Sequence, residues 1–279
     1  MKASARLRNL AKKLERIIAG LIWIAIGLSS SSTLGAEPAS SVAQTQWTSR
    51  LQQGRFQILA DFELADNQSF LSELSSTSSG VCDILKLPRT GQPIHIVLFG
   101  NAKEYSRYIK NYFPTAPERR ALFIQGRGPG MLFAHWHNDV LTDIRHEVVH
   151  GLLNDQANPL PIWLDEGFAE YFEVAEKDRL ANNPHLIEIR HELNVGNVPA
   201  LEDLEALNQI EQLGNVQYRD SWAWVHFMLH RSPHTRHQLV QQLGALRAGE
   251  PQMPLSRQIA SAWPNWRTEF AEHFHTLAK

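Results

Sequence analysis

Cysteine is almost absent from this sequence, because Cys82 is the only one among 279 residues. A single cysteine excludes an intramolecular disulfide, so an oxidising compartment would not stabilise the fold. Cys82 also lies too far from the N terminus to serve as a lipoprotein anchor. It belongs to the apolar stretch 81–85, and we predict that it is a small buried hydrophobic residue.

The N-terminal region lacks an apolar run long enough to span a membrane comfortably. The uncharged stretch Ile17–Leu28 has twelve residues, which is short for a membrane helix but typical of a signal peptide. Six basic residues precede it, and a serine-rich run ending in Ala36 follows it. We therefore predict a signal peptide over residues 1–36, cleaved after Ala36, and a periplasmic or secreted protein. Leu34 is imperfect at the third position before that cut, so an uncleaved N-terminal membrane anchor is the alternative.

Clusters of basic residues are missing from the rest of the chain. The first 36 residues carry six basic residues and one acidic residue, and their removal takes the formal net charge from −2 to −7. A domain of that charge is a poor candidate for binding nucleic acid, and we expect no nucleic-acid partner. The glycine-rich segment 126–130 lacks the spacing of a phosphate-binding loop, and no internal repeat is present.

The sequence does contain the run Arg-His-Glu-Val-Val-His at 145–150, which has the form H-E-x-x-H. On a helix, His146 and His150 lie on one face and can present imidazole nitrogens to one metal ion. Glu166 follows sixteen residues after His150 and adds a carboxylate. Two imidazoles and one carboxylate are the ligands of a catalytic zinc site, in which a fourth position stays open for water.

Glu147 directly follows the first histidine and would lie beside the metal without binding it. Zinc lowers the pKa of bound water and polarises a scissile carbonyl, and Glu147 would accept the water proton and pass it to the leaving amine. The same ligands suit manganese or cobalt. Each histidine also needs an acceptor for its second ring nitrogen, and we predict that Glu170, one turn after Glu166, is such an acceptor.

Helical periodicity predicts that both parts of the site lie on helices. Leu141, Ile144, Val148 and Leu152 recur at helical spacing, which predicts a core helix from Asp139 to about Leu153. The segment 154–161 is rich in turn-forming residues and predicts a loop. Pro161 is then well placed to open a second helix, over 162 to about 174, in which the small Gly167 would allow close approach.

Other interpretations stay open at four positions near the motif. Glu170 can also be a solvent-facing helix residue or a salt-bridge partner. Asp165 is more often a charge at a helix start or on the surface than a ligand. His135 and His137 have the alternate spacing of a strand and could bind metal, but a complete ligand set elsewhere favours surface or cleft positions for them.

The two segments HEVVHGLLN and PIWLDEGFAEYFE resemble the gluzincin superfamily of zinc peptidases, and most closely its bacterial peptidase MA-like group. The resemblance is tight over about 141–173 and loose on either side. It implies that His146, His150 and Glu166 bind zinc and that Glu147 is the catalytic carboxylate. Gluzincins often carry a downstream tyrosine that donates a hydrogen bond to the oxyanion, and Tyr218 stands at the matching position.

The sequence departs from the superfamily's aminopeptidases before the metal-binding helix. Those enzymes have a Gly-Ala-Met-Glu-Asn strand whose glutamate holds the free amine of the substrate. Here the segment 126–133 contains no carboxylate. Endopeptidase activity is therefore favoured over aminopeptidase activity.

The fold expected from these patterns is α+β and zincin-like. We predict a flexible lead-in at 37–54, a small mixed or antiparallel sheet subdomain at 55–138, and a mainly helical subdomain at 139–279, with zinc at their junction. The expected elements before the motif are strands at 56–60, 95–99, 121–125 and 131–135, a helix at 66–85 with a weak centre at 75–80, and a helix capped by Asn101 that ends near Tyr112.

Three functions follow from the sequence as alternatives. The first is an exported zinc metallopeptidase that acts on an extended peptide or protein substrate. The second is a catalytically silent, zinc-containing peptide-binding or cell-envelope scaffold protein. The third is a membrane-associated structural protein, which retention of the stretch 17–28 as an anchor would favour. The sequence leaves the substrate preference and the oligomeric state open.

Overall fold

The computed structural model describes residues 47–64, 68–126, 128–154 and 158–277. The predicted signal peptide and most of the predicted lead-in lie outside these residues. The chain divides into two compact units, one made of residues up to Gln68 with Gln92–Asn138, the other of Ser69–Gly91 with Asp139–Lys279. In the part of the chain that the structure describes, no helix combines the length and the apolar character needed to cross a membrane.

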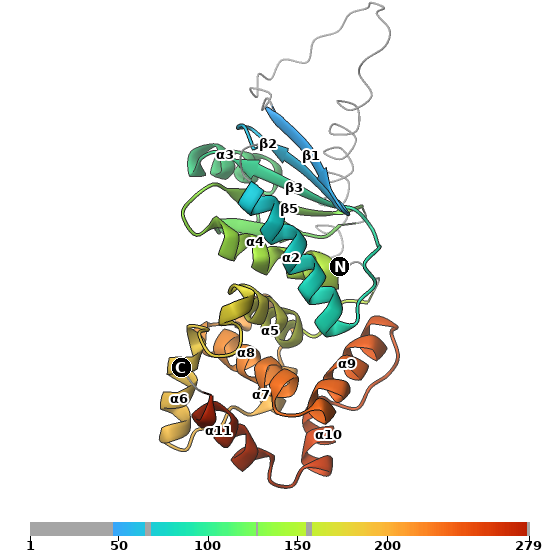
Figure 1. Cartoon of the computed structure of the whole chain (residues 1–279), viewed down its shortest axis with the longest axis vertical. Helices are drawn as coiled ribbons and strands as arrows, with labels where there is room; N and C mark the ends of the chain where they lie inside the picture. The colour runs from blue at the N-terminus through green and yellow to red at the C-terminus, as the bar shows by residue number, and fades with distance from the viewer. Residues whose placement is uncertain (1–46, 65–67, 127, 155–157, 278–279) are drawn as a thin grey trace, which may run out of the picture. The chain divides into compact units, whose positions relative to one another are not determined.

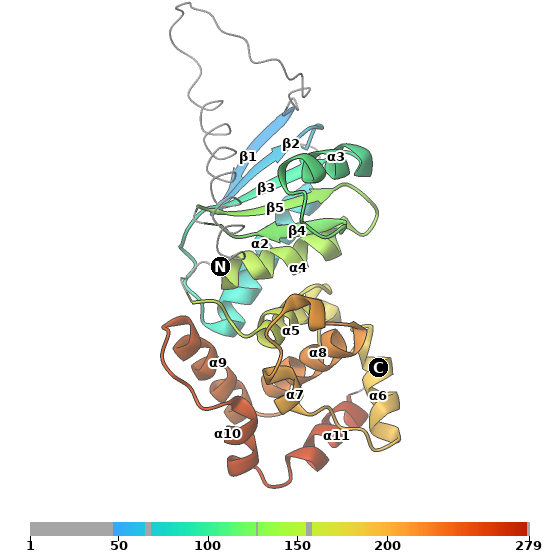
Figure 2. The same ribbon diagram turned by 180° about the vertical axis from the view of Figure 1, so that it is seen from behind.

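The first unit contains one mixed sheet of five strands in the order β1-β2-β3-β5-β4 (Figure 1). The strands are β1 (Ser49–Gln53), β2 (Phe56–Ala60), β3 (Ile94–Phe99), β4 (Ala121–Ile124) and β5 (Gly130–His135). The three inner strands are parallel, whereas β1 and β4 run antiparallel to their neighbours. Figure 2 shows β4 beside β5. These are the two strands that were predicted before and after the glycine-rich segment 126–130.

The strand β3 lies in the middle of the sheet and is largely buried. Five of its six residues are buried, with only His95 partly exposed, as expected for a strand covered on both faces. The helix α3 (Ala102–Tyr112) follows directly and contacts β3 and β5. The side chain of Asn101 accepts a hydrogen bond from the backbone N–H of Glu104 at 3.0 Å, which confirms the predicted cap.

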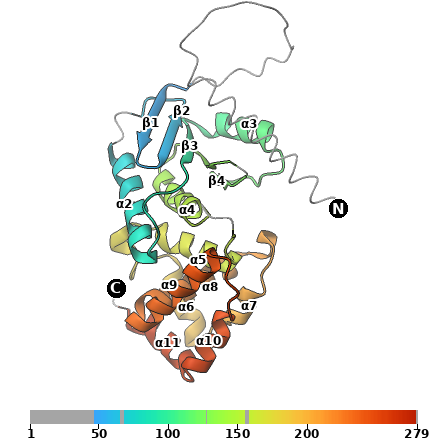
Figure 3. The ribbon, with the colours of Figure 1, turned by 90° about the vertical axis from the view of Figure 1, so that its right-hand side faces the viewer.

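The second unit is helical. Its helices are α2 (Gln68–Leu85), α4 (Val140–Leu153), α5 (Ile162–Phe172), α6 (His185–Asn194), α7 (Leu201–Glu205), α8 (Asn215–His230), α9 (Pro233–Arg247), α10 (Leu255–Ala262) and α11 (Trp266–Thr276), with short 3-10 turns at Glu176–Asp178 and Ile210–Gln212. Ten of the sixteen residues of the long helix α8 are buried, and the helix contacts α5, α6, α9 and α11 (Figure 3). Trp222 and Trp224 are each 1% exposed and belong to this core.

The close approach predicted for Gly167 is to α8. A Cβ atom added at Gly167 would lie 2.6 Å from the backbone oxygen of Ser221 and 2.8 Å from a methyl group of Val225. Both distances are shorter than van der Waals contact, so a larger residue here would push the two helices apart. This places the backbone of α5, the helix that carries Glu166, directly against the core helix.

The structure confirms an α+β chain with a mixed sheet followed by a mainly helical region, but two boundaries differ from the prediction. Ser49–Gln53, predicted to be part of a flexible lead-in, forms the edge strand β1. The polar composition of this segment gives no strand signal in the sequence, because an edge strand has only one neighbouring strand and needs little hydrophobic patterning. Ser69–Gly91, predicted to belong with the sheet, clusters with the helical unit, and α2 runs unbroken through its serine-rich centre.

Candidate metal centre

The two histidines of the motif lie on one face of α4, one turn apart. Ile144, Val148 and Leu152 are each at most 2% exposed, so one side of this helix is held by apolar burial. Glu166 lies in the second turn of α5, which packs against α4. All three side chains therefore belong to the same compact unit.

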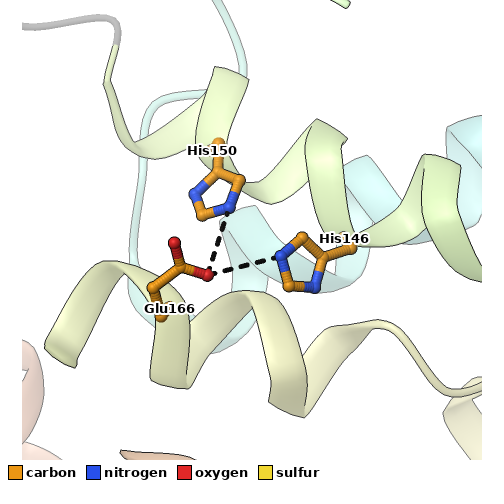
Figure 4. Close-up of side chains that lie close together, drawn as sticks. All are labelled: His146, His150 and Glu166. Atoms are coloured by element: carbon orange, nitrogen blue, oxygen red, sulfur yellow. Dashed lines mark ion pairs between the residues drawn. The ribbon is translucent and has the colours of Figure 1, made fainter. Parts of the chain in front are cut away.

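The three side chains converge on a common point. The Nε2 atoms of His146 and His150 lie 3.4 Å and 3.7 Å from Oε2 of Glu166. Figure 4 shows both imidazoles pointing from α4 toward the carboxylate on α5. Glu166 is only 5% exposed and His150 9%, so bulk water has little access to these groups.

The donor atoms have the spacing that a tetrahedral metal site needs. Ligand atoms about 2.0–2.2 Å from one ion at tetrahedral angles lie roughly 3.3–3.6 Å apart. Of the two nitrogen–oxygen separations, 3.4 Å falls within this range and 3.7 Å lies just above it, and one ligand atom from each of the three residues lies within 4.8 Å of the others. Two nitrogens and one carboxylate oxygen are also donors that zinc prefers. The residues present therefore fit the ion that the sequence predicts.

Asp165 contacts the second ring nitrogen of His150. Its Oδ2 lies 3.0 Å from Nδ1 of His150, and the side-chain amide of Asn154 donates hydrogen bonds to both oxygens of the same carboxylate, at 3.1 Å and 3.3 Å. The sequence favoured a plain helix-start or surface charge at Asp165. The contact arises because Asp165 and Glu166 are consecutive on α5, so that one carboxylate faces each side of the His150 ring.

The second ring nitrogen of His146 meets Glu173 rather than the residue we expected. Nδ1 of His146 lies 3.3 Å from Oε2 of Glu173 and 3.9 Å from Oε1 of Glu170. The hydrogen bond of Glu170 is instead with Nε2 of His185, at 2.9 Å. Glu173 follows the last residue of α5. Helical periodicity alone therefore favours Glu170, because the position of a residue beyond the helix end cannot be read from spacing.

Arg145 holds the end of α5 in place. Its guanidinium donates to the backbone oxygen of Glu173 and, at 3.0 Å, to the carboxylate of Glu73 on α2. Arg145 is 8% exposed, so these are largely buried charge-assisted contacts. The residue next to the first histidine thus fixes the backbone of the glutamate that contacts this histidine.

Carboxylates dominate the electrostatics of the centre. Burial disfavours the charged form of His146, but Glu166 and Glu173 outweigh it and raise its pKa well above 6.5. At His150, Asp165 and Glu166 likewise outweigh burial and raise the pKa to about 9. The negative potential that holds a proton on these imidazoles also favours a bound cation.

A second group of possible ligands overlaps the first. His146, Glu170 and Glu173 also present one ligand atom each within 4.8 Å of one another. This group uses the opposite side of the His146 ring, as the contacts of Nδ1 with both glutamates indicate. One imidazole would have to serve both groups, so the first group, with two imidazoles, is the better site for zinc.

The other residues singled out by the sequence lie as follows. Glu147 is buried on α4 beside His146. Tyr218 is half-buried in the first turn of α8, the helix that packs against α5. His135 and His137 belong to the sheet unit, with ring centroids 4.9 Å apart, and neither is part of a metal-binding group among the residues that the structure describes.

No protein-family model matches the chain, and comparison with curated proteins finds no significant relative. The motifs and their geometry therefore carry the functional argument alone.

Proposed function

We propose that this protein is an exported zinc metallopeptidase of the gluzincin type. The observation that carries the proposal is the convergence of His146, His150 and Glu166, with Glu147 on the same helix turn as the first histidine. The zincin-like placement of zinc at the junction of sheet and helices belongs to the same proposal. So does the endopeptidase preference, which rests on the segment 126–133 without a carboxylate.

Each side chain then has a defined task. Zinc would supply a Lewis acid that activates water and polarises the scissile carbonyl. Asp165 and Glu173 would keep the Nδ1 proton of each histidine, so that both Nε2 lone pairs face Glu166. Glu147 would take a proton from water and deliver it to the leaving amine. Tyr218 would donate a hydrogen bond to the oxyanion, as the resemblance implies.

Metal analysis of the purified protein tests the proposal first. We expect about one zinc ion per chain, strongly reduced in a Glu166→Ala variant and unchanged in Glu188→Ala, which removes an exposed carboxylate from α6. Full zinc retention in Glu166→Ala would assign the metal to the group of His146, Glu170 and Glu173. Absence of zinc from all three proteins would overturn the proposal.

Cleavage of a peptide library separates an enzyme from a silent zinc protein. The Glu147→Gln variant should keep its zinc and lose at least about a hundredfold in cleavage rate, because it lacks the general base. Blocked peptides, without a free amine, should be cleaved as well as unblocked ones if the enzyme is an endopeptidase. A wild-type protein that holds zinc but cleaves no peptide would favour the scaffold alternative.

A further inference from the structure

A cavity in the helical unit lies apart from the metal centre. It has a volume of about 870 Å³ and is formed by the end of α2, the end of α8 and the first half of α9. This volume falls in the range of pockets that hold small molecules. Its walls combine apolar side chains with positive charges: Ile84, Leu229, Val240, Lys86, Arg231 and Arg236. None of the candidate metal ligands lines it.

Some of the charges at the cavity are already neutralised. Arg231 forms ion pairs with Glu269 at 3.2 Å and with Glu272 at 3.6 Å. The one carboxylate among the lining residues, Asp83, pairs with Arg89 at 2.6 Å. These groups therefore need no ligand to satisfy them.

Lys86 and Arg236, unlike Arg231 and Asp83, are not neutralised by a partner among the described residues. Neither side chain forms a hydrogen bond or an ion pair with another residue in the part of the chain that the structure describes. His230, which also lines the cavity, bonds to the hydroxyl of Tyr171 at 2.8 Å. Burial and the charge of Arg236 lower the pKa of His230 to about 4, so it is neutral at pH 7. Lys86 and Arg236, both exposed to solvent, thus give the lining two cations and no free carboxylate.

The backbone conformation of Lys86 also supports a binding role for this residue. Lys86 has φ +58°, in the left-handed region, and it follows the last residue of α2. The N–H of Leu87 donates to the carbonyl of Cys82 at 3.0 Å, which is the bond that closes a helix of this kind. Glycine is the favoured residue at such a position. A lysine here adopts a less favourable backbone conformation and places its side chain at the cavity.

We propose that this cavity binds a small molecule that has a carboxylate or phosphate head and an apolar body. Lys86 and Arg236 bind the head by charge-assisted hydrogen bonds, and Ile84, Leu229 and Val240 contact the body. The N terminus of α9 contributes little, because Ser232 already accepts a hydrogen bond from the N–H of Thr235. The proposal does not depend on the peptidase activity.

Calorimetric titration of the full chain with simple amphiphiles tests it. Octyl phosphate and octanoate, both below their micelle concentrations, separate phosphate from carboxylate heads; inorganic phosphate lacks the apolar body, and octyltrimethylammonium reverses the charge. We expect saturable binding of at least one of the two anionic amphiphiles, with much weaker binding of the other two probes. The same affinity in the Glu166→Ala variant would show that the metal centre is not the site of binding.

Variants of the two cations complete the test. Loss of one charged hydrogen-bond donor should weaken binding about tenfold or more in Lys86→Gln and in Arg236→Gln. Arg257→Gln removes an exposed charge on α10 and should leave binding unchanged. Lys86→Gly should weaken binding and yet raise the thermal unfolding midpoint, because glycine accepts the positive φ. This pair of effects cannot arise from misfolding.

Two results would overturn the proposal. One is the absence of saturable binding of either anionic amphiphile to the wild-type protein. The other is equal affinity in wild type, Lys86→Gln and Arg236→Gln, which would show that the ligand does not use these charges.

Discussion

Metal binding at the candidate centre would depend on carboxylates that contact the far nitrogen of each imidazole. An imidazole can offer Nε2 to a metal only if its proton stays on Nδ1, and an acceptor at Nδ1 fixes that tautomer. Asp165 provides this acceptor for His150, and Glu173 provides it for His146. Asn154 in turn orients Asp165 by hydrogen bonds to both of its oxygens.

Replacement of these acceptors should weaken metal binding without removing a ligand. We expect Asp165→Asn and Glu173→Gln each to lower zinc affinity about 10–100-fold, measured by competition with a chromophoric chelator. Asp203→Asn, an exposed carboxylate on α7, serves as control. Glu170→Gln should have a smaller effect, because its hydrogen bond is with His185. A larger loss for Glu170→Gln than for Glu173→Gln would restore the role first expected of Glu170.

At the scale of single residues, the sequence predicts which residues form the candidate metal centre better than it predicts the contacts of those residues. The spacing of His146, His150 and Glu166 is enough to bring them together, because two helices joined by a short loop have few ways to pack. Asp165 and Glu173 were not predicted as partners of the histidines. Their contacts depend on where α5 begins and ends relative to α4, and that depends on packing against the rest of the helical unit.

At the scale of elements, the position of α5 is set by its contact with α8. The absence of a side chain at Gly167 lets the two backbones meet. The sequence indicates that a small residue here permits close approach, but the partner helix begins almost fifty residues later and only the structure identifies it. The edge strand β1 was missed for a related reason, because its one neighbour, rather than its composition, makes it a strand.

Two glycine substitutions test this packing. Gly167→Ala should destabilise the protein by about 1–3 kcal/mol, because the new methyl group meets the backbone of Ser221. Gly244→Ala, in the interior of α9 with no atom near the new methyl group, should instead stabilise by about 0.4–1 kcal/mol. Urea unfolding measures both. Equal effects of the two substitutions would show that the helix contact does not limit the residue at 167. Gly167→Ala should also lower zinc affinity, since α5 carries Glu166.

At the scale of the whole molecule, a histidine cluster links α8 to three other parts of the helical unit. Nδ1 of His226 on α8 lies 2.9 Å from Nε2 of His273 on α11, and Nε2 of His226 lies 2.9 Å from the backbone oxygen of Leu180. His230, one turn further along α8, bonds to Tyr171 on α5. The charges that lower the histidine pKa values are Arg236 at His230, and His230 and Arg231 at His273.

These histidines should make the folded protein sensitive to acid. Burial and the neighbouring positive charges lower the pKa of His230 and of His273 to about 4, and burial lowers that of His226 well below 6.5. The unfolded chain, with pKa values near 6.5, therefore binds protons between pH 6.5 and 4 that the folded protein does not. The free energy of unfolding of the protein should therefore fall as the pH drops from 6.5 to 4, by up to about 1.4 kcal/mol per pH unit for each such histidine.

The comparison of wild type with His273→Gln isolates this effect. Glutamine keeps a donor and an acceptor but does not titrate, so the variant should lose less stability than wild type as the pH falls from 6.5 to 4. Any metal bound at the candidate centre would be lost from both proteins alike at low pH, so its contribution cancels in the difference of their unfolding free energies, measured in urea at each pH. His275→Gln, an exposed neighbour on α11, should follow wild type. Parallel curves for wild type and His273→Gln would mean that the cluster is protonated together with the unfolded chain, and that acid sensitivity arises elsewhere.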